Sequence, residues 1–143
     1  MSFRVGISML VVCLVWSAAA FARSTQYNGP AASGNGAGVE FGLQRTPGKQ
    51  SKVRRFGFYN IPAQCKGYGP TAVTGRLTIT MKVSRRRTFS GSESLNGGRQ
   101  TVHVTGTFKR GFGKATGTLR VRGSVPGCAS ADTAVVRWSA PTA

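Results

Sequence analysis

Residues 73–83 read Val-Thr-Gly-Arg-Leu-Thr-Ile-Thr-Met-Lys-Val, and this stretch decides the fold class. Small or apolar side chains occupy every odd position from Val73 to Val83. Threonine, arginine and lysine occupy every even position. Alternation sustained over this length is typical of a β-strand with one buried face and one solvated face. We therefore predict a half-buried strand here.

The same two-residue period returns along the rest of the chain. It is clear at 101–109 and 115–122, and weaker at 39–44, 53–60, 86–90 and 133–139. Glycine-rich turn signals separate these segments, and the one at 111–113 predicts a hairpin. Twenty glycines and no sustained helical spacing disfavour helices. We expect an all-β fold, an antiparallel β-sandwich of about seven strands over residues 38–143. Its predicted core is Phe56, Phe58, Leu77, Ile79, Met81, Val102, Val104, Phe108, Leu119, Val121, Val136 and Trp138.

The first 37 residues have a different composition. Residues 1–22 hold one arginine, then an apolar run, then Ala20-Phe21-Ala22, which is the order of a signal peptide cleaved after Ala22. The alternative is an uncleaved membrane anchor, but the apolar run is well short of the roughly 20 residues that a span needs. Residues 23–37 are small, polar and glycine-rich, and we predict a flexible tail. The sequence therefore predicts a secreted or extracytoplasmic protein without a transmembrane segment after cleavage.

Two cysteines follow the predicted signal peptide, with 62 residues between Cys65 and Cys128. A cysteine pair in an exported chain is typical of a disulfide. The alternatives are a metal pair or a catalytic thiol. The metal pair is disfavoured, because a metal site needs more ligands than two distant cysteines and one histidine supply. We predict a Cys65–Cys128 disulfide, no metal and no cofactor.

Charge is the strongest functional signal in the sequence. Lys and Arg total 20, whereas Asp and Glu total three. An excess of this size attracts acidic polymers or cell-envelope components in a salt-dependent way. The candidate polyanion-binding residues are Lys52, Arg54, Arg55, Arg85, Arg86, Arg87, Lys109, Arg110, Lys114, Arg120 and Arg122. The alternative is a generally basic surface, with edge charges that prevent strand-to-strand aggregation.

Residues suited to catalysis are few. The only histidine is His103, and the three acids Glu40, Glu93 and Asp132 lie far apart in sequence. Acid–base hydrolysis needs titratable groups held together, and no nucleophile motif such as G-x-S-x-G appears. Residues 106–111 begin like a phosphate-binding loop but lack its lysine, and residues 110–113 match only half of an RNA-recognition motif. We predict no catalytic residue and no specific nucleic-acid motif.

A loose resemblance covers most of the chain after the signal peptide. It depends on Gly106-Thr107-Phe108, residues 117–121 (Gly-Thr-Leu-Arg-Val), Cys128 and residues 136–140 (Val-Arg-Trp-Ser-Ala). These features resemble small, uncharacterised secreted bacterial β-sandwich proteins with one cysteine pair. The resemblance implies a fold and a location, and no activity. The predicted function is a secreted, non-catalytic binding or envelope-associated module. The alternatives are a purely structural extracellular domain and, less favoured, a small secreted hydrolase.

Overall fold

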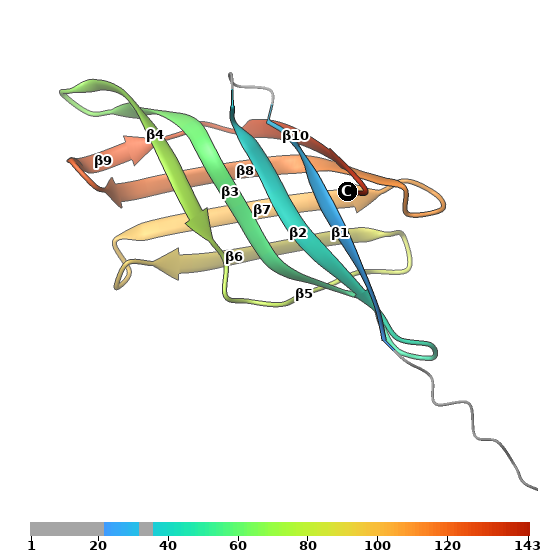
Figure 1. The fold of residues 1–143 in the computed structure, drawn as a ribbon. Helices are drawn as coiled ribbons and strands as arrows, with labels where there is room; N and C mark the ends of the chain where they lie inside the picture. Colours follow the sequence, from blue (N-terminus) through green and yellow to red (C-terminus); the bar gives the residue numbers. More distant parts are fainter. Residues whose placement is uncertain (1–21, 32–35) are drawn as a thin grey trace, which may run out of the picture.

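The computed structural model describes residues 22–31 and 36–143, which form ten β-strands (Figure 1). The predicted signal peptide at 1–22 lies outside the described residues except for Ala22. The strands are β1 (Arg23–Pro30), β2 (Gly38–Arg45), β3 (Lys52–Cys65), β4 (Gly69–Arg76), β5 (Met81–Lys82), β6 (Thr88–Leu95), β7 (Gln100–Phe108), β8 (Lys114–Val125), β9 (Cys128–Asp132) and β10 (Val136–Pro141). The described part of the chain contains no helix long and apolar enough to cross a membrane. The predicted all-β, antiparallel class is confirmed.

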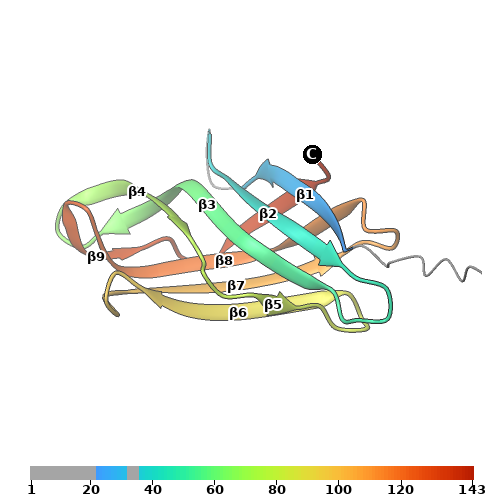
Figure 2. The ribbon, with the colours of Figure 1, turned by 60° about the horizontal axis from the view of Figure 1, so that its bottom comes forward.

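The strands form two layers of one hydrogen-bonded sheet. The main strand order is β1-β2-β3-β9-β8-β7-β6, with β4 and β5 paired to β3 and β10 paired to β8. In Figure 1 the layer of β1–β4 crosses obliquely in front of β6, β7, β8 and β10. Figure 2 shows β5 running beside β6 at the lower edge. The sequence predicted about seven strands, and the additional ones are β1, β9 and the short β5.

The predicted flexible tail at 23–37 is wrong for its first part. Arg23–Pro30 forms β1, which pairs with β2 in unbroken register from Arg23–Arg45 to Pro30–Gly38. Tyr27 is buried, its ring stacks on Phe41 at 4.9 Å between centroids, and its hydroxyl donates to the Phe112 carbonyl at 2.5 Å. The small, polar residues of this segment bury little apolar area of their own. The buried Tyr27 ring and the full ladder of backbone hydrogen bonds to β2 offset the entropy that the segment loses on ordering. Residues 32–35 of that predicted tail lie outside the described residues.

The alternating stretch at 73–83 is not one strand. Its first part belongs to β4, and β5 begins only at Met81. Between them the Glu93 carboxylate of β6 accepts hydrogen bonds from the Thr78 amide at 2.8 Å and from the Thr78 hydroxyl. A side chain from the other layer thus supplies the partner that a neighbouring strand would have supplied. The inward face of this stretch still follows the sequence pattern.

The core lies between the two layers and is rich in aromatic rings. Phe56 of β3 meets Trp138 of β10 at 5.7 Å between ring centroids, and Phe41 of β2 meets Phe89 of β6 at 5.8 Å. Every predicted core residue is buried except Ile79, which is partly buried against the core. The sequence therefore placed the buried faces correctly although some strand limits differ.

The predicted disulfide is present. Cys65 ends β3, Cys128 begins β9, and their Cα atoms lie 5.9 Å apart. The bond adds a covalent link where the β3 and β9 ladders meet through only two residue pairs, Gln64–Asp132 and Cys65–Ala131.

Candidate functional site

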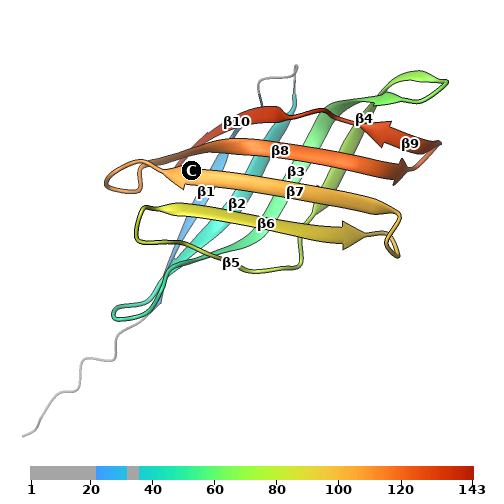
Figure 3. The ribbon, with the colours of Figure 1, turned by 180° about the vertical axis from the view of Figure 1, so that it is seen from behind.

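Three turns gather at one end of the molecule, opposite the disulfide. They are residues 46–51 between β2 and β3, residues 83–87 between β5 and β6, and residues 109–113 between β7 and β8. The Val83 amide donates to the Ser51 carbonyl at 2.9 Å, and the Phe108 amide donates to the Arg87 carbonyl at 2.8 Å. Figure 3 shows the three turns at the same end of the fold, seen from behind. The turns of both layers therefore form one surface.

This end, which we call the basic end, collects eleven lysines and arginines from five strands and three turns. Backbone pairing brings the segments together, with Arg23 opposite Arg45 and Lys52 opposite Lys82. The Arg45 guanidinium lies 4.8 Å from the centre of the Phe112 ring, which joins β2 to the β7–β8 turn. The basic end comprises Arg23, Arg45, Lys49, Lys52, Lys82, Arg85, Arg86, Arg87, Lys109, Arg110 and Lys114.

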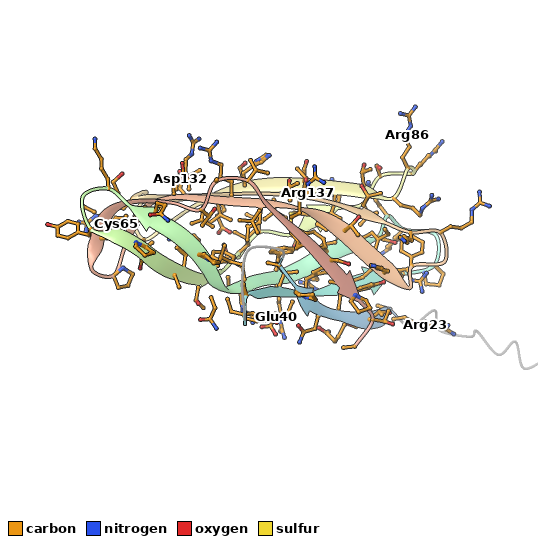
Figure 4. The ribbon with its side chains drawn as sticks, turned by 90° about the horizontal axis from the view of Figure 1, so that it is seen from above. Arg23, Glu40, Cys65, Arg86, Asp132 and Arg137 are labelled. Carbon is orange, nitrogen blue, oxygen red and sulfur yellow. A yellow bond between two sulfur atoms is a disulfide. The ribbon has the colours of Figure 1, made fainter. Side chains whose placement is uncertain are left out.

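No acidic side chain of the described residues lies at the basic end. Glu40 sits in β2 and pairs with Arg76, Asp132 sits in β9 and pairs with Arg120, and Glu93 caps the backbone near Thr78. Figure 4 shows Arg86 and Arg23 at one end of the molecule and Cys65 at the other. The cations of the basic end therefore depend on solvent, salt or a ligand for their counter-charge.

The turn that carries Arg85–Arg87 is held by its own hydrogen bonds. The Arg87 amide donates to the Ser84 carbonyl at 2.9 Å, and the Ser84 amide donates to the Thr88 carbonyl at 2.8 Å. The Arg87 guanidinium donates through Nε to the Phe108 carbonyl at 3.2 Å, whereas Arg85 and Arg86 are exposed at the tip. The turn is thus fixed to β7 and presents two solvated guanidiniums, a group whose planar fork suits carboxylate, sulfate and phosphate.

The structure brings some of the sequence-predicted basic residues together and separates others. Seven of them belong to the basic end: Lys52, Arg85, Arg86, Arg87, Lys109, Arg110 and Lys114. Arg54 and Arg55 lie slightly inward, on the outer face of β3. Arg120 and Arg122 lie on β8, farther from the basic end, where Arg122 faces Thr101 and Asp132.

Sequence reasoning missed four members of the basic end: Arg23, Arg45, Lys49 and Lys82. Each stands alone in the sequence, or in a segment interpreted as a tail, so no local run of charge marked it. The β1–β2 register brings Arg23 beside Arg45, and the β3–β5 register brings Lys82 beside Lys52, whereas Lys49 lies in the turn between β2 and β3. A search for charges at predicted strand ends would have found two of the four, Arg45 and Lys82.

The groups considered for catalysis are not assembled into a site. His103 is exposed on β7, and its Nδ1 lies 2.5 Å from the Ser92 hydroxyl of β6. The neighbouring β8 residue in the same row is Arg120, whose guanidinium occupies both oxygens of Asp132 at 3.2 and 2.8 Å. Ser92 and His103 therefore stand on an open sheet face without a carboxylate to orient the imidazole. Within residues 22–31 and 36–143, no group of three metal-ligating side chains lies together.

Asp132 provides a pH-dependent contact. The hydrogen bonds from Arg120, helped by the Ala134 amide at 2.8 Å, hold the pKa of the Asp132 carboxyl below its ordinary value. A depressed carboxyl pKa stabilises the fold above the unfolded value near 3.9, and this stabilisation is lost as pH falls through the folded value. We expect Asp132→Asn to lower the melting temperature by no more than a few degrees at neutral pH, because the pair is partly exposed. Melting temperatures measured from pH 6 to pH 2 check this. The difference between the variant and wild type should shrink toward pH 2. A difference that stays constant would contradict the link between Asp132 ionisation and stability.

Comparison of the chain with protein-family models, with curated proteins and with solved structures finds no match.

Proposed function

We propose that this protein is a secreted, non-catalytic binding module that attaches to anionic polymers or envelope components through the basic end. The observation that carries the proposal is the collection of eleven cations at one end without an acidic side chain among the described residues there. Such a concentration of charge steers polyanions toward one surface and releases their counterions on contact. The alternative is a structural extracellular domain whose charge acts only as a diffuse field.

The disulfide and the N-terminal segment also support the proposal, because both fit an exported protein. The Cys65–Cys128 disulfide is compatible with an oxidising, extracytoplasmic compartment, because such bonds are rare where thiols are kept reduced. We infer that residues 1–22 direct export and are cleaved after Ala22. The resemblance to small secreted bacterial β-sandwich proteins remains part of this proposal.

The decisive variant removes four exposed cations from the basic end: Lys49→Gln, Arg85→Gln, Arg86→Gln and Arg110→Gln. Arg45 and Arg87 are left intact because each holds a structural contact. Log affinity for heparin should fall as log salt rises, and we expect this dependence to become less steep by up to about 3 in the variant. Each phosphate or sulfate contact contributes roughly 0.7 to 0.9 to the steepness. Affinity chromatography on heparin, on DNA and on cell-wall polysaccharide, over a salt series, measures this.

The matched control removes four exposed cations elsewhere: Lys66→Gln, Arg99→Gln, Arg122→Gln and Arg137→Gln. It has the same net charge as the basic-end variant, so a diffuse field would respond equally to both. We expect the control to retain at least about tenfold more affinity than the basic-end variant. Equal losses in the two variants would reject the basic end as a site and favour the structural alternative.

A further inference from the structure

A polar groove of about 960 Å³ crosses the outer face of β1, β2 and β3. Its lining includes Gln26 and Asn28 of β1, Gln44 of β2, and Arg54, Arg55 and Arg76. Figure 4 places Glu40, another lining residue, on this outer side and Asp132 on the opposite outer side of the molecule. The groove thus lies on the opposite outer face from Asp132 and its partner Arg120 of β8 (Figure 4).

Gly42 lines the groove, and Gly57 lies beneath the Arg76–Glu40 pair that borders it. A β-carbon at Gly42 would lie 3.2 Å from the Gln26 Nε2 atom. A β-carbon at Gly57 would lie 3.3 Å from both the Arg76 Nη2 atom and the Glu40 Cγ atom. Because neither position carries a side chain, the long polar side chains of neighbouring strands lie close to the backbone and leave the space above it open.

The groove is rich in hydrogen-bond donors. Arg54 donates through Nη1 to the Gln44 Oε1 atom at 2.8 Å, and the Tyr59 hydroxyl donates to the Asn28 Oδ1 atom at 2.9 Å. These contacts occupy the amide oxygens and leave both amide NH₂ groups without a partner among the described residues. The Arg55 guanidinium likewise has no hydrogen-bond partner within the described part of the chain. A ligand that fits must therefore be rich in acceptors.

Arg76 is held in place for such a ligand. Its Nη1 atom donates to the Arg55 carbonyl at 3.1 Å, and its Nη2 atom pairs with the Glu40 carboxylate. Among the side chains that line the groove, the three cations Arg54, Arg55 and Arg76 outnumber the one carboxylate, Glu40. Carboxylate groups are the natural partners of such guanidiniums, and sugar hydroxyls are natural partners of free amides.

Nucleic acid is a poorer fit to the groove than polysaccharide. Among the described residues, the large hydrophobic side chains that are well exposed are Tyr68 and Val135, and neither lines the groove. Tyr59 is half-buried and its hydroxyl is engaged by Asn28. Single-stranded nucleic acids bind by stacking bases on exposed aromatic rings, and the groove offers no such platform.

We propose that the groove binds a segment of an acidic, carboxylate-bearing polysaccharide, with the amides of Asn28 and Gln44 and the guanidiniums of Arg55 and Arg76 as its contacts. This inference rests on the proposed function, because it names the class of polymer that the basic end attracts. The basic end supplies long-range attraction, and the groove supplies directional hydrogen bonds that survive salt.

The test uses the full chain expressed with its own N-terminal segment, and short oligogalacturonides as the probe. The variant Asn28→Ala with Gln44→Ala changes no charge, and Gln64→Ala removes an exposed β3 amide outside the groove as a control. Calorimetric titration at roughly 0.5 M salt suppresses diffuse attraction, because the screening length there is only about 4 Å. We expect the double variant to lose about tenfold or more in affinity and the control to lose less than about twofold.

The outcomes separate this inference from the proposed function. Unchanged binding of the oligogalacturonide by the double variant would overturn the groove while leaving the basic end untouched. A basic-end variant that still binds long polymers as wild type would instead overturn the proposed function. Equal binding of a short thymidine oligonucleotide, weakened by the same double variant, would reject polysaccharide as the ligand class. Should the double variant fold poorly, side-chain amide shifts of Asn28 and Gln44 in the wild-type protein on titration decide the question, and unmoved signals would count against the groove.

Discussion

Replacing Gly117 with alanine is expected to prevent stable folding. Gly117 lies in β8 between Gly106 of β7 and Trp138 of β10. A β-carbon there would lie 1.9 Å from the Thr105 carbonyl oxygen and 2.5 Å from the Trp138 ring. The first obstacle is backbone in a paired strand, so it cannot move aside without breaking the β7–β8 ladder. Overpacking of a core commonly costs about 1–3 kcal/mol, and a clash with backbone belongs above that range.

Gly113→Ala is the matched control for this prediction. Gly113 lies in the β7–β8 turn, and a β-carbon there would meet no atom within 4 Å. Its backbone is also outside the left-handed region, so alanine there should change the free energy of unfolding by less than about 0.5 kcal/mol. Soluble yield and urea unfolding measure both variants. A Gly117→Ala protein that melts within a few degrees of wild type would mean that β7, β8 and Trp138 are not arranged as described.

The second large effect is expected on removing the disulfide. The double variant Cys65→Ala and Cys128→Ala opens a loop with a sequence separation of 63 residues. Chain-entropy arguments assign about 4 kcal/mol to a loop of this length, a large part of the roughly 5–15 kcal/mol that stabilises a typical domain. The effect should not be compensated locally, because the β3 and β9 ladders share only two residue pairs beside the bond.

Urea unfolding of the double variant, and of wild type with reductant, checks this prediction. We expect both to lose about 4 kcal/mol and to melt more than about 10 °C lower. The control changes the exposed neighbours of the two cysteines, Lys66→Ala with Ala129→Ser, and should melt like wild type. A loss below about 1 kcal/mol in the double variant would show that the disulfide does not stabilise the fold by reducing the conformational entropy of the unfolded chain.

The buried face of each strand follows from the sequence. At 73–83, 101–109 and 115–122, apolar or small residues occupy every second position. In the structure these positions face the core. Alternation succeeds because a strand turns successive side chains to opposite faces whatever its partners are. The disulfide was also predictable, because only one pair of cysteines follows the predicted export segment.

Strand partners, by contrast, came only from the tertiary structure. The composition of 23–30 gave no sign of a strand, and β1 exists because β2 offers a complete ladder and Phe41 offers a stacking surface to Tyr27. The alternation at 73–83 is continuous in the sequence, but the strand is interrupted in the structure. It is interrupted because the Glu93 carboxylate reaches the Thr78 amide from the other layer.

The candidate sites divide in the same way. Arg85–Arg87 and the Lys109–Arg110 pair were visible as local runs of charge, whereas Arg23, Arg45 and Lys82 became part of the basic end only through the register of distant strands. Arg54 and Arg55 were predicted to bind polyanions, but the groove itself was not predicted, because its other amides and guanidiniums come from separate strands. The two-residue period is a property of each segment alone, so the sequence by itself determined the all-β class and the buried faces. Which cations and amides share one surface depends on pairing between segments far apart in the chain, and only the folded sheet decided that.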